Sequence, residues 1–136
     1  MPFNTAYETD FYKIEVNLEG NLLYSEWLRH VSEDELITGG TKLYEVLRDT
    51  KIERALANGQ AIGALTPNAK EWMSVEFYEL LSQTNLKRLA RIMPVSVFHQ
   101  LALESVITRA EALGKTRFQV KNFSDKEEGM KWLIEA

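Results

Sequence analysis

Few residues in this chain could carry chemistry, and each of them also has an ordinary structural interpretation. Thr66 stands directly before Pro67. A hydroxyl at the start of a helix could accept a phosphate, because the helix N-terminus stabilises negative charge. Threonine before proline is also a usual helix cap, since its oxygen accepts a hydrogen bond from a free backbone N–H. Thr66 is therefore a candidate phosphoacceptor or partner-facing residue, with a plain helix cap as the alternative.

The densest group of basic residues consists of Lys87, Arg88 and Arg91. Side chains alternate between the two faces of a strand, so Lys87 and Arg91 should share one face while Arg88 points to the other. Such a group could bind an anionic partner, and it could equally serve solubility and protect a sheet edge from unwanted pairing. We treat the three residues as a candidate partner surface.

Aromatic side chains form a third candidate site. Trp72, Phe77 and Phe98 fall in segments with helical spacing, where large apolar side chains normally fill the core. Around an enclosed cavity of roughly 300 Å³ or more, the same side chains would suit a flat or acyl ligand. We treat these three residues as candidate ligand-lining residues.

The sequence lacks the common catalytic and metal-binding patterns. Cysteine is absent, which excludes disulfides, thiolate zinc sites and cysteine nucleophiles. The two histidines, His30 and His99, lie far apart in the sequence, and no carboxylates repeat a metal-ligand spacing near them. Neither a Gly-x-Ser-x-Gly motif nor a phosphate-binding glycine loop occurs. We therefore expect a protein that is not an enzyme and that uses no metal or cofactor.

The composition favours one domain with no nucleic-acid partner. The chain has 136 residues and a net charge of −4 at pH 7, with acidic and basic residues interspersed. An acidic balance argues against dedicated nucleic-acid binding, which depends on Lys and Arg. The N-terminus lacks the basic start and apolar core of a signal peptide, and the longest uncharged stretch, 55–69, is too short and polar to span a bilayer. We expect a cytoplasmic protein.

Segments of period two and segments of helical period alternate along the chain. Residues 1–10 are predicted to be a loose lead-in, and residues 11–136 a single domain. The turn Glu19-Gly20-Asn21 joins the first two strands as an antiparallel hairpin. The predicted strands are 12–18, 22–28, 54–62, 86–93 and 117–120, and the predicted helices begin at capping residues Ser32, Thr66, Ser96 and Ser124.

Two further signals refine the helices and the fold class. Gly39-Gly40 inside the first helix costs about 1 kcal/mol per glycine relative to alanine, which predicts a close approach of this helix to the sheet. Strands separated by helices imply parallel pairing with right-handed crossovers. The expected fold is therefore α/β, with a mixed five-stranded sheet, an N-terminal antiparallel hairpin and about four packed helices.

This order of elements resembles the STAS/SEC14-like class, and within it the SpoIIAA-like family of small bacterial proteins. The resemblance covers about residues 11–135. The matching features are Trp27 shortly before Val31-Ser32-Glu33-Asp34-Glu35, the run Thr66-Pro67-Asn68-Ala69-Lys70-Glu71-Trp72, the strand Leu86-Lys87-Arg88-Leu89-Ala90-Arg91-Ile92, and the ending Phe123 through Leu133.

The resemblance implies a non-enzymatic regulatory or protein-interaction module, which would bind a protein partner or a second copy of itself. STAS domains often carry a phosphorylatable serine, preceded by aspartate, at the start of the helix after the third strand. The corresponding region here is Gly63-Ala64-Leu65-Thr66-Pro67 and has no Asp-Ser pair. The chain therefore departs from the family pattern at the residues on which the phosphorylation switch depends. SEC14-like relatives imply the alternative of a carrier or sensor of a small apolar or amphipathic, lipid-like ligand.

Overall fold

A computed structural model describes residues 2–135 and places a six-stranded sheet at the centre of the molecule, in the order β1-β2-β3-β4-β5-β6. β1, β2 and β3 pair antiparallel, whereas β3, β4, β5 and β6 pair parallel, so the sheet is mixed as predicted. The strands are β1 (Asn4–Glu8), β2 (Tyr12–Asn17), β3 (Leu22–Trp27), β4 (Arg54–Asn58), β5 (Arg88–Ile92) and β6 (Gln119–Phe123).

The prediction of five strands is wrong because the predicted lead-in contains β1. This strand pairs antiparallel with β2, and its register shifts between Thr5 and Tyr7. Tyr7 is half-buried and the other four side chains of β1 are exposed. An edge strand of this kind is held by backbone pairing, so it lacks the alternating apolar pattern by which strands are recognised in a sequence.

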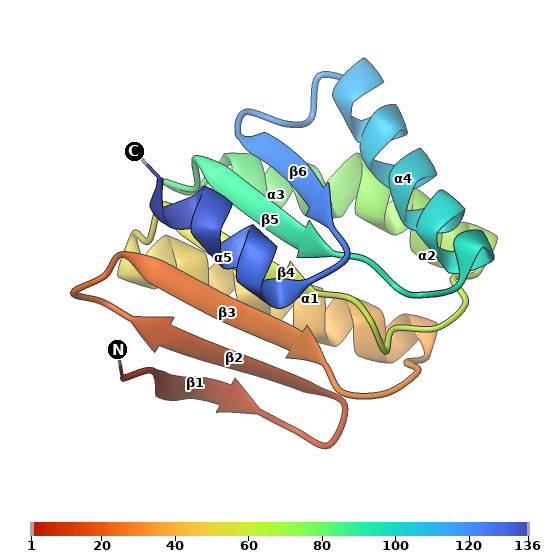
Figure 1. Ribbon diagram of the computed structural model, residues 1–136. Coiled ribbons are helices and arrows are strands. Elements are labelled where there is room, and N and C mark those ends of the chain that lie inside the picture. The colour runs from red at the N-terminus through yellow and green to blue at the C-terminus, as the bar shows by residue number, and fades with distance from the viewer. Residues whose placement is uncertain (1, 136) are drawn as a thin grey trace.

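Helices cover the two faces of the sheet unequally (Figure 1). Among the helices of residues 2–135, only α5 (Lys126–Ile134) lies against the front face in this view. The opposite face carries α1 (Glu33–Thr50), α4 (Val97–Ala112) and a continuous helix made of α2 (Pro67–Trp72), a π-helical segment (Met73–Phe77) and α3 (Tyr78–Ser82). The larger hydrophobic core lies on this opposite face, and a smaller core lies beneath α5. No described helix has both the length and the apolar composition needed to cross a bilayer.

Side-chain caps confirm where two of the helices begin. Ser32 Oγ accepts a hydrogen bond from the Glu35 N–H at 3.1 Å, and the Glu35 carboxylate accepts one from the Ser32 N–H at 2.9 Å. Thr66 Oγ1 accepts from the Ala69 N–H at 3.1 Å, with Pro67 at the first helical position. Both caps satisfy backbone donors that have no partner inside their own helix.

The last helix begins one residue later than predicted. Asp125, not Ser124, caps α5, and its carboxylate accepts from the Glu127 N–H at 2.8 Å. β6 runs on to Phe123, beyond the predicted strand end at Val120, so the turn into α5 is displaced toward the C-terminus. The adjacent serine and aspartate are both good cap residues, and the strand end decides between them.

The glycine pair in α1 permits close packing, as predicted. A Cβ atom on Gly39 would lie 2.8 Å from the Trp27 ring of β3 and 2.9 Å from the Tyr12 ring of β2. A Cβ atom on Gly40 would lie 2.7 Å from the Trp72 ring. Gly39 therefore brings α1 close to the sheet, and Gly40 makes room for the neighbouring helix α2.

Candidate functional site

Thr66 lies at an exposed helix start and is already engaged as a cap. Its hydroxyl also donates to the Glu33 carboxylate at 3.3 Å. An open groove of about 250 Å³ borders it, lined in part by His30 and Ala64. A phosphate on this oxygen would face the Glu33 carboxylate, and like charges at such a distance repel. The geometry favours the capping role, and the role as phosphoacceptor stays a prediction.

The three basic residues do not form one surface. Lys87 is exposed just before β5, and its Nζ lies 3.6 Å from the Glu53 carboxylate. Arg88 and Arg91 lie on β5 and point to opposite faces of the sheet, as the alternation predicts. Arg91 is only 4% exposed, so the candidate partner surface that included it is wrong. Solvent reaches Lys87 and part of Arg88, but not all three residues.

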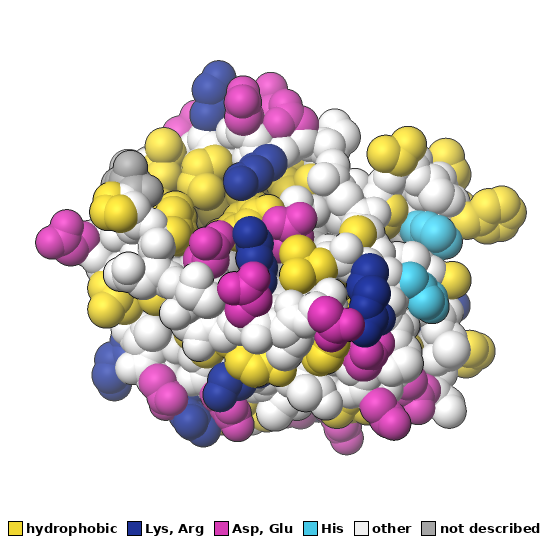
Figure 2. Space-filling model, turned by 90° about the horizontal axis from the view of Figure 1, so that it is seen from below, with side chains coloured by type: hydrophobic (Ala, Val, Ile, Leu, Met, Phe, Trp, Pro, Cys, Tyr) yellow, Lys and Arg dark blue, Asp and Glu magenta, His cyan; other side chains and the backbone are white. Residues whose placement is uncertain are grey.

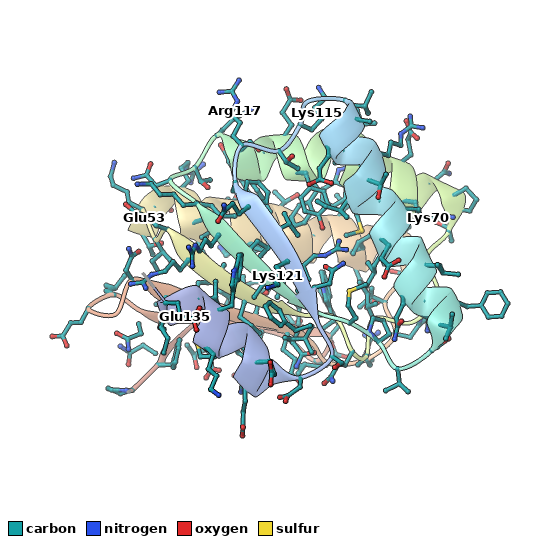
Figure 3. All side chains as sticks on the ribbon, turned by 45° about the horizontal axis from the view of Figure 1, so that its top comes forward. Glu53, Lys70, Lys115, Arg117, Lys121 and Glu135 are labelled. Atoms are coloured by element: carbon teal, nitrogen blue, oxygen red, sulfur yellow. The ribbon has the colours of Figure 1, made fainter. Side chains whose placement is uncertain are left out.

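Arg88 fastens the end of α5 to the sheet. Its Nη1 donates to the carbonyl oxygens of Trp132, at 2.8 Å, and Glu135, at 2.9 Å. The guanidinium also lies 5.1 Å from the centre of the Trp132 ring. Last-turn carbonyls have no partner inside their own helix, and they carry partial negative charge that a cation complements. Glu53 and Glu135, which contact Lys87 and Arg88, lie on the same side of the view in Figure 3.

Arg91 holds three elements together from inside the larger core. Its Nε donates to Asn122 Oδ1 on β6, its Nη1 to the Tyr78 hydroxyl on α3, and its Nη2 to the Leu103 carbonyl on α4, each at 2.9 Å. All three acceptors are neutral. No carboxylate of the described residues forms an ion pair with Arg91.

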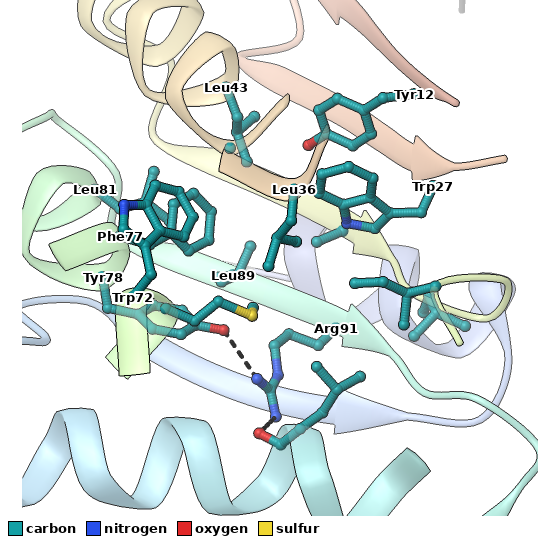
Figure 4. A pocket seen from close by; sticks show the side chains of 17 residues that line it. Tyr12, Trp27, Leu36, Leu43, Trp72, Phe77, Tyr78, Leu81, Leu89 and Arg91 are labelled. Atoms are coloured by element: carbon teal, nitrogen blue, oxygen red, sulfur yellow. Dashed lines mark hydrogen bonds between the residues drawn. The ribbon is translucent and has the colours of Figure 1, made fainter. Parts of the chain in front are cut away.

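An aromatic-lined cavity lies beside Arg91, between the sheet and the helices (Figure 4). Its volume is about 50 Å³. Tyr12 and Trp27 stack along one side with ring centres 3.8 Å apart. Trp72 and Phe77 stack with ring centres 5.3 Å apart and also line the cavity. The structure thus places Trp72 and Phe77 together, as candidate ligand-lining residues should be, although the space between them is small.

Phe98 is not part of this cavity, so its prediction as a ligand-lining residue is wrong. Its side chain is 83% exposed at the start of α4. Phe98 shares a helical repeat with Val106 and Ala110, which are buried, but Phe98 lies in the first turn of α4, and full burial along this helix begins only at Leu103. The buried stripe of α4 is Leu103, Val106, Ile107 and Ala110.

The π-helical segment shapes the wall of the cavity. At its end the Tyr78 N–H donates to the Met73 carbonyl, which closes a wider turn than that of an α-helix. Met73, Phe77 and Tyr78 all line the cavity, and the Tyr78 hydroxyl reaches Arg91. π-helical turns often occur at functional sites. Sequence reasoning missed this element because no residue pattern distinguishes it from an ordinary helix.

Apolar side chains also gather on the surface where α4 begins. Val95 is 89% exposed, Val97 66%, Phe98 83% and Leu101 56%, and we call these four residues the apolar tip. Figure 2 shows hydrophobic side chains projecting at the end of the molecule where the histidines lie, while charges of both signs cover much of the rest of that face. One feature of the sequence could have indicated this surface: residues 92–103 contain no Asp, Glu, Lys or Arg.

The clearest displacement of a carboxylate pKa has a structural cause. Hydrogen bonds from Arg29, and then from Ser32, lower the pKa of Glu35 to about 2. Arg29 Nη2 lies 2.8 Å from the Glu35 carboxylate and 3.2 Å from that of Asp10, which joins the start of α1 to the β1–β2 turn. Within residues 2–135 no three metal-ligating side chains gather around a common point.

Comparison with protein-family models, curated proteins and solved structures finds no match for this chain. The likeness to the SpoIIAA-like family therefore stays a prediction. The structure itself shows the coarser statement, a mixed α/β sheet with helices on both faces.

Proposed function

We propose that this protein is a non-enzymatic interaction module that pairs with a second copy of itself through the apolar tip. The observation that carries the proposal is the exposure of Val95, Val97, Phe98 and Leu101 at one end of α4. The STAS-like class, the regulatory role and the cytoplasmic location expected from the sequence belong to the same proposal.

Association would remove a large apolar surface from water. Together these side chains expose on the order of several hundred Å², comparable with the largest apolar patch of a typical monomer. Burial of such a surface is the main driving force of most protein association. Contiguous apolar patches of this size often mark interaction sites, whereas single exposed hydrophobic residues need no explanation.

The charge distribution favours a second copy as the occupant. The protein carries a net charge of −4, so two copies repel each other over much of their surfaces. Residues 92–103 have no formal charge, and two tips can meet there without placing like charges together. The flanking charges in the sequence are the buried Arg91 and the acidic Glu104, a poor arrangement for an anionic membrane, which basic residues recognise.

The tip is held in place by the rest of α4. Leu103 and Val106 are buried in the larger core, and the Leu103 carbonyl accepts from Arg91 at 2.9 Å. Farther along the helix, Arg109 pairs with Glu71 of α2 at 2.9 Å. A surface that is already ordered loses little conformational entropy when a partner binds. This arrangement suits a symmetric pair in which each tip packs on the other.

The lipid-carrier alternative has less support. A drug-sized ligand needs a cavity of roughly 300 Å³ or more, and an acyl chain is of comparable bulk. The aromatic-lined cavity measures about 50 Å³. The larger spaces are open grooves, such as the one beside Thr66. We therefore do not extend the proposal to a lipid-sized ligand.

Sedimentation velocity over a range of protein concentrations tests the proposal. We expect the wild-type protein to form a reversible dimer, and Phe98→Asp to stay monomeric because a carboxylate would have to be buried between two tips. Leu18→Asp is the matched control. Leu18 is also 64% exposed, but it lies in the turn after β2, so this variant should dimerise like the wild type.

A wild-type protein that stays monomeric at every concentration would contradict the proposal. So would a Phe98→Asp variant that dimerises as well as the Leu18→Asp control. Binding of the monomer to lipid vesicles, or to an unrelated protein, through the same tip would replace the second copy with another occupant and would also overturn the proposal.

A further inference from the structure

A buried positive charge without an opposite charge nearby sets Arg91 apart from the other side chains of the core. An arginine remains protonated in proteins, and burial of a charge is costly unless the charge is well paired. Arg91 has five N–H donors, of which the three described hydrogen bonds use one on each nitrogen. One N–H on each Nη therefore has no partner among the described residues.

The cavity beside Arg91 gives a small anion a place to bind. A water molecule needs roughly 10–15 Å³ of such space, so a cavity of about 50 Å³ has room for a molecule with a few heavy atoms. The cavity walls are almost entirely apolar, and the Arg91 guanidinium and the Tyr78 hydroxyl lie together at one side (Figure 4). A ligand that fits must be negatively charged at one end and apolar at the other.

We propose that the aromatic-lined cavity binds a small monocarboxylate, such as acetate or propionate, whose carboxylate pairs with Arg91. A guanidinium offers N–H donors in a fork that matches the two oxygens of a carboxylate. The short alkyl end of the ligand packs between the Trp27 and Trp72 sides of the cavity. The ligand supplies the negative charge that the core itself lacks.

The size and shape of the cavity restrict the ligand class. A divalent anion such as phosphate would place a second negative charge against apolar walls, which is unfavourable. A long-chain acid exceeds the volume of the cavity. Chloride carries the right charge but has no alkyl end to fill the apolar part. Binding should therefore depend on both charge and chain length.

Isothermal titration calorimetry with sodium acetate, propionate and octanoate, and with sodium chloride at equal ionic strength, tests this site. We expect saturable binding of one acetate or propionate per chain, and none of octanoate or chloride. Arg91→Gln should weaken binding roughly tenfold or more, because a charged donor is lost. Arg88→Gln, which changes the arginine on the opposite face, should leave the affinity within about twofold of the wild type.

Ala57→Leu keeps the test decisive if Arg91→Gln fails to fold. Ala57 lines the cavity from β4, so a leucine there should fill the apolar part and abolish binding while Arg91 remains. The proposal is overturned if no carboxylate binds the wild-type protein, if chloride or octanoate binds as well as acetate, or if Ala57→Leu binds unchanged. Phe98→Asp should retain acetate binding, which separates this site from the proposed self-association.

Discussion

Arg88 and Arg91 lie on the same strand, β5, and their side chains leave the sheet on opposite faces. On the α5 face, Arg88 meets backbone carbonyls at a helix end, where partial negative charge is already present. On the face that carries the larger core, Arg91 donates only to neutral oxygens and borders an aromatic-lined cavity. On one face the arginine caps the end of a helix. On the other face the arginine has no ion-pair partner among the described residues and lies beside a cavity.

The two cores differ in a parallel way. The core beneath α5 is small, and Leu133 is its fully buried contribution from the helix. Gly129 lets α5 approach the sheet, where an added Cβ atom would lie 2.9 Å from Ile92 Cδ1. The larger core is built from three helical segments and includes the π-helical turn. One short helix covers the smaller core, whereas the cavity lies in the larger core, where strands and several helical segments line it together.

The largest expected effect concerns the small core. Leu133→Ala should lower the free energy of unfolding by about 2–5 kcal/mol, because it removes the fully buried anchor of α5 and leaves a cavity. Urea unfolding measures the change. Ile134→Ala is the control, since Ile134 is 53% exposed on the same helix and should change stability by less than about 0.5 kcal/mol. Equal losses in the two variants would show that α5 is not docked through Leu133.

A smaller effect is expected from the arginine on the α5 face. Arg88→Gln should cost about 1–2 kcal/mol of stability, because two charge-assisted hydrogen bonds to the end of α5 are lost. Lys87→Gln removes only an exposed ion pair with Glu53 and should cost less than about 0.5 kcal/mol. Urea unfolding of both variants measures the two losses of stability. A larger loss in Lys87→Gln than in Arg88→Gln would contradict the role of Arg88 in holding the end of α5.

The smallest effect on stability at neutral pH is expected from the tyrosines of the two cores, which differ in pKa. Burial raises the pKa of Tyr24, beneath α5, to about 12, and it raises the pKa of Tyr12, in the larger core, further. Between pH 10 and 12 unfolded tyrosine ionises while folded Tyr24 does not, so stability falls as the pH rises through this range. In an alkaline absorbance titration, Tyr24→Phe should lose an ionisation step near pH 12. Tyr12→Phe should keep that step. If Tyr12→Phe lost the step near pH 12, the assignment of this ionisation to Tyr24 would be wrong.

The sequence predicts the elements of this fold well where local chemistry decides. The alternation from Tyr12 to Val16, the caps at Ser32 and Thr66, and the glycine pair in α1 all act over a few residues, and the structure bears them out. The predicted strand runs one residue too far, because Leu18 is exposed in the turn after β2. The first strand was missed because its edge position leaves its side chains exposed. The cap of α5 was missed by one residue because β6 extends farther than its apolar pattern.

The candidate sites are harder to predict, because they depend on which face of an element meets which neighbour. Alternation correctly separates Arg88 from Arg91, but it does not show that α3, α4 and β6 close over Arg91. Phe98 shares a helical repeat with the buried Val106 and Ala110, yet it lies in the first turn of α4, before the packed part of the helix begins at Leu103. Tertiary packing, not residue spacing, decided both positions.

The strand order of the sheet is also the order of the strands along the chain. Each new strand therefore joins the edge left by the strand before it, and no strand is inserted between two that are already paired. During synthesis the N-terminal strands appear first, so the sheet can add strands one at a time, each at the same growing edge. The final strand, β6, completes the sheet, and α5, which follows it in the chain, packs on β4, β5 and β6.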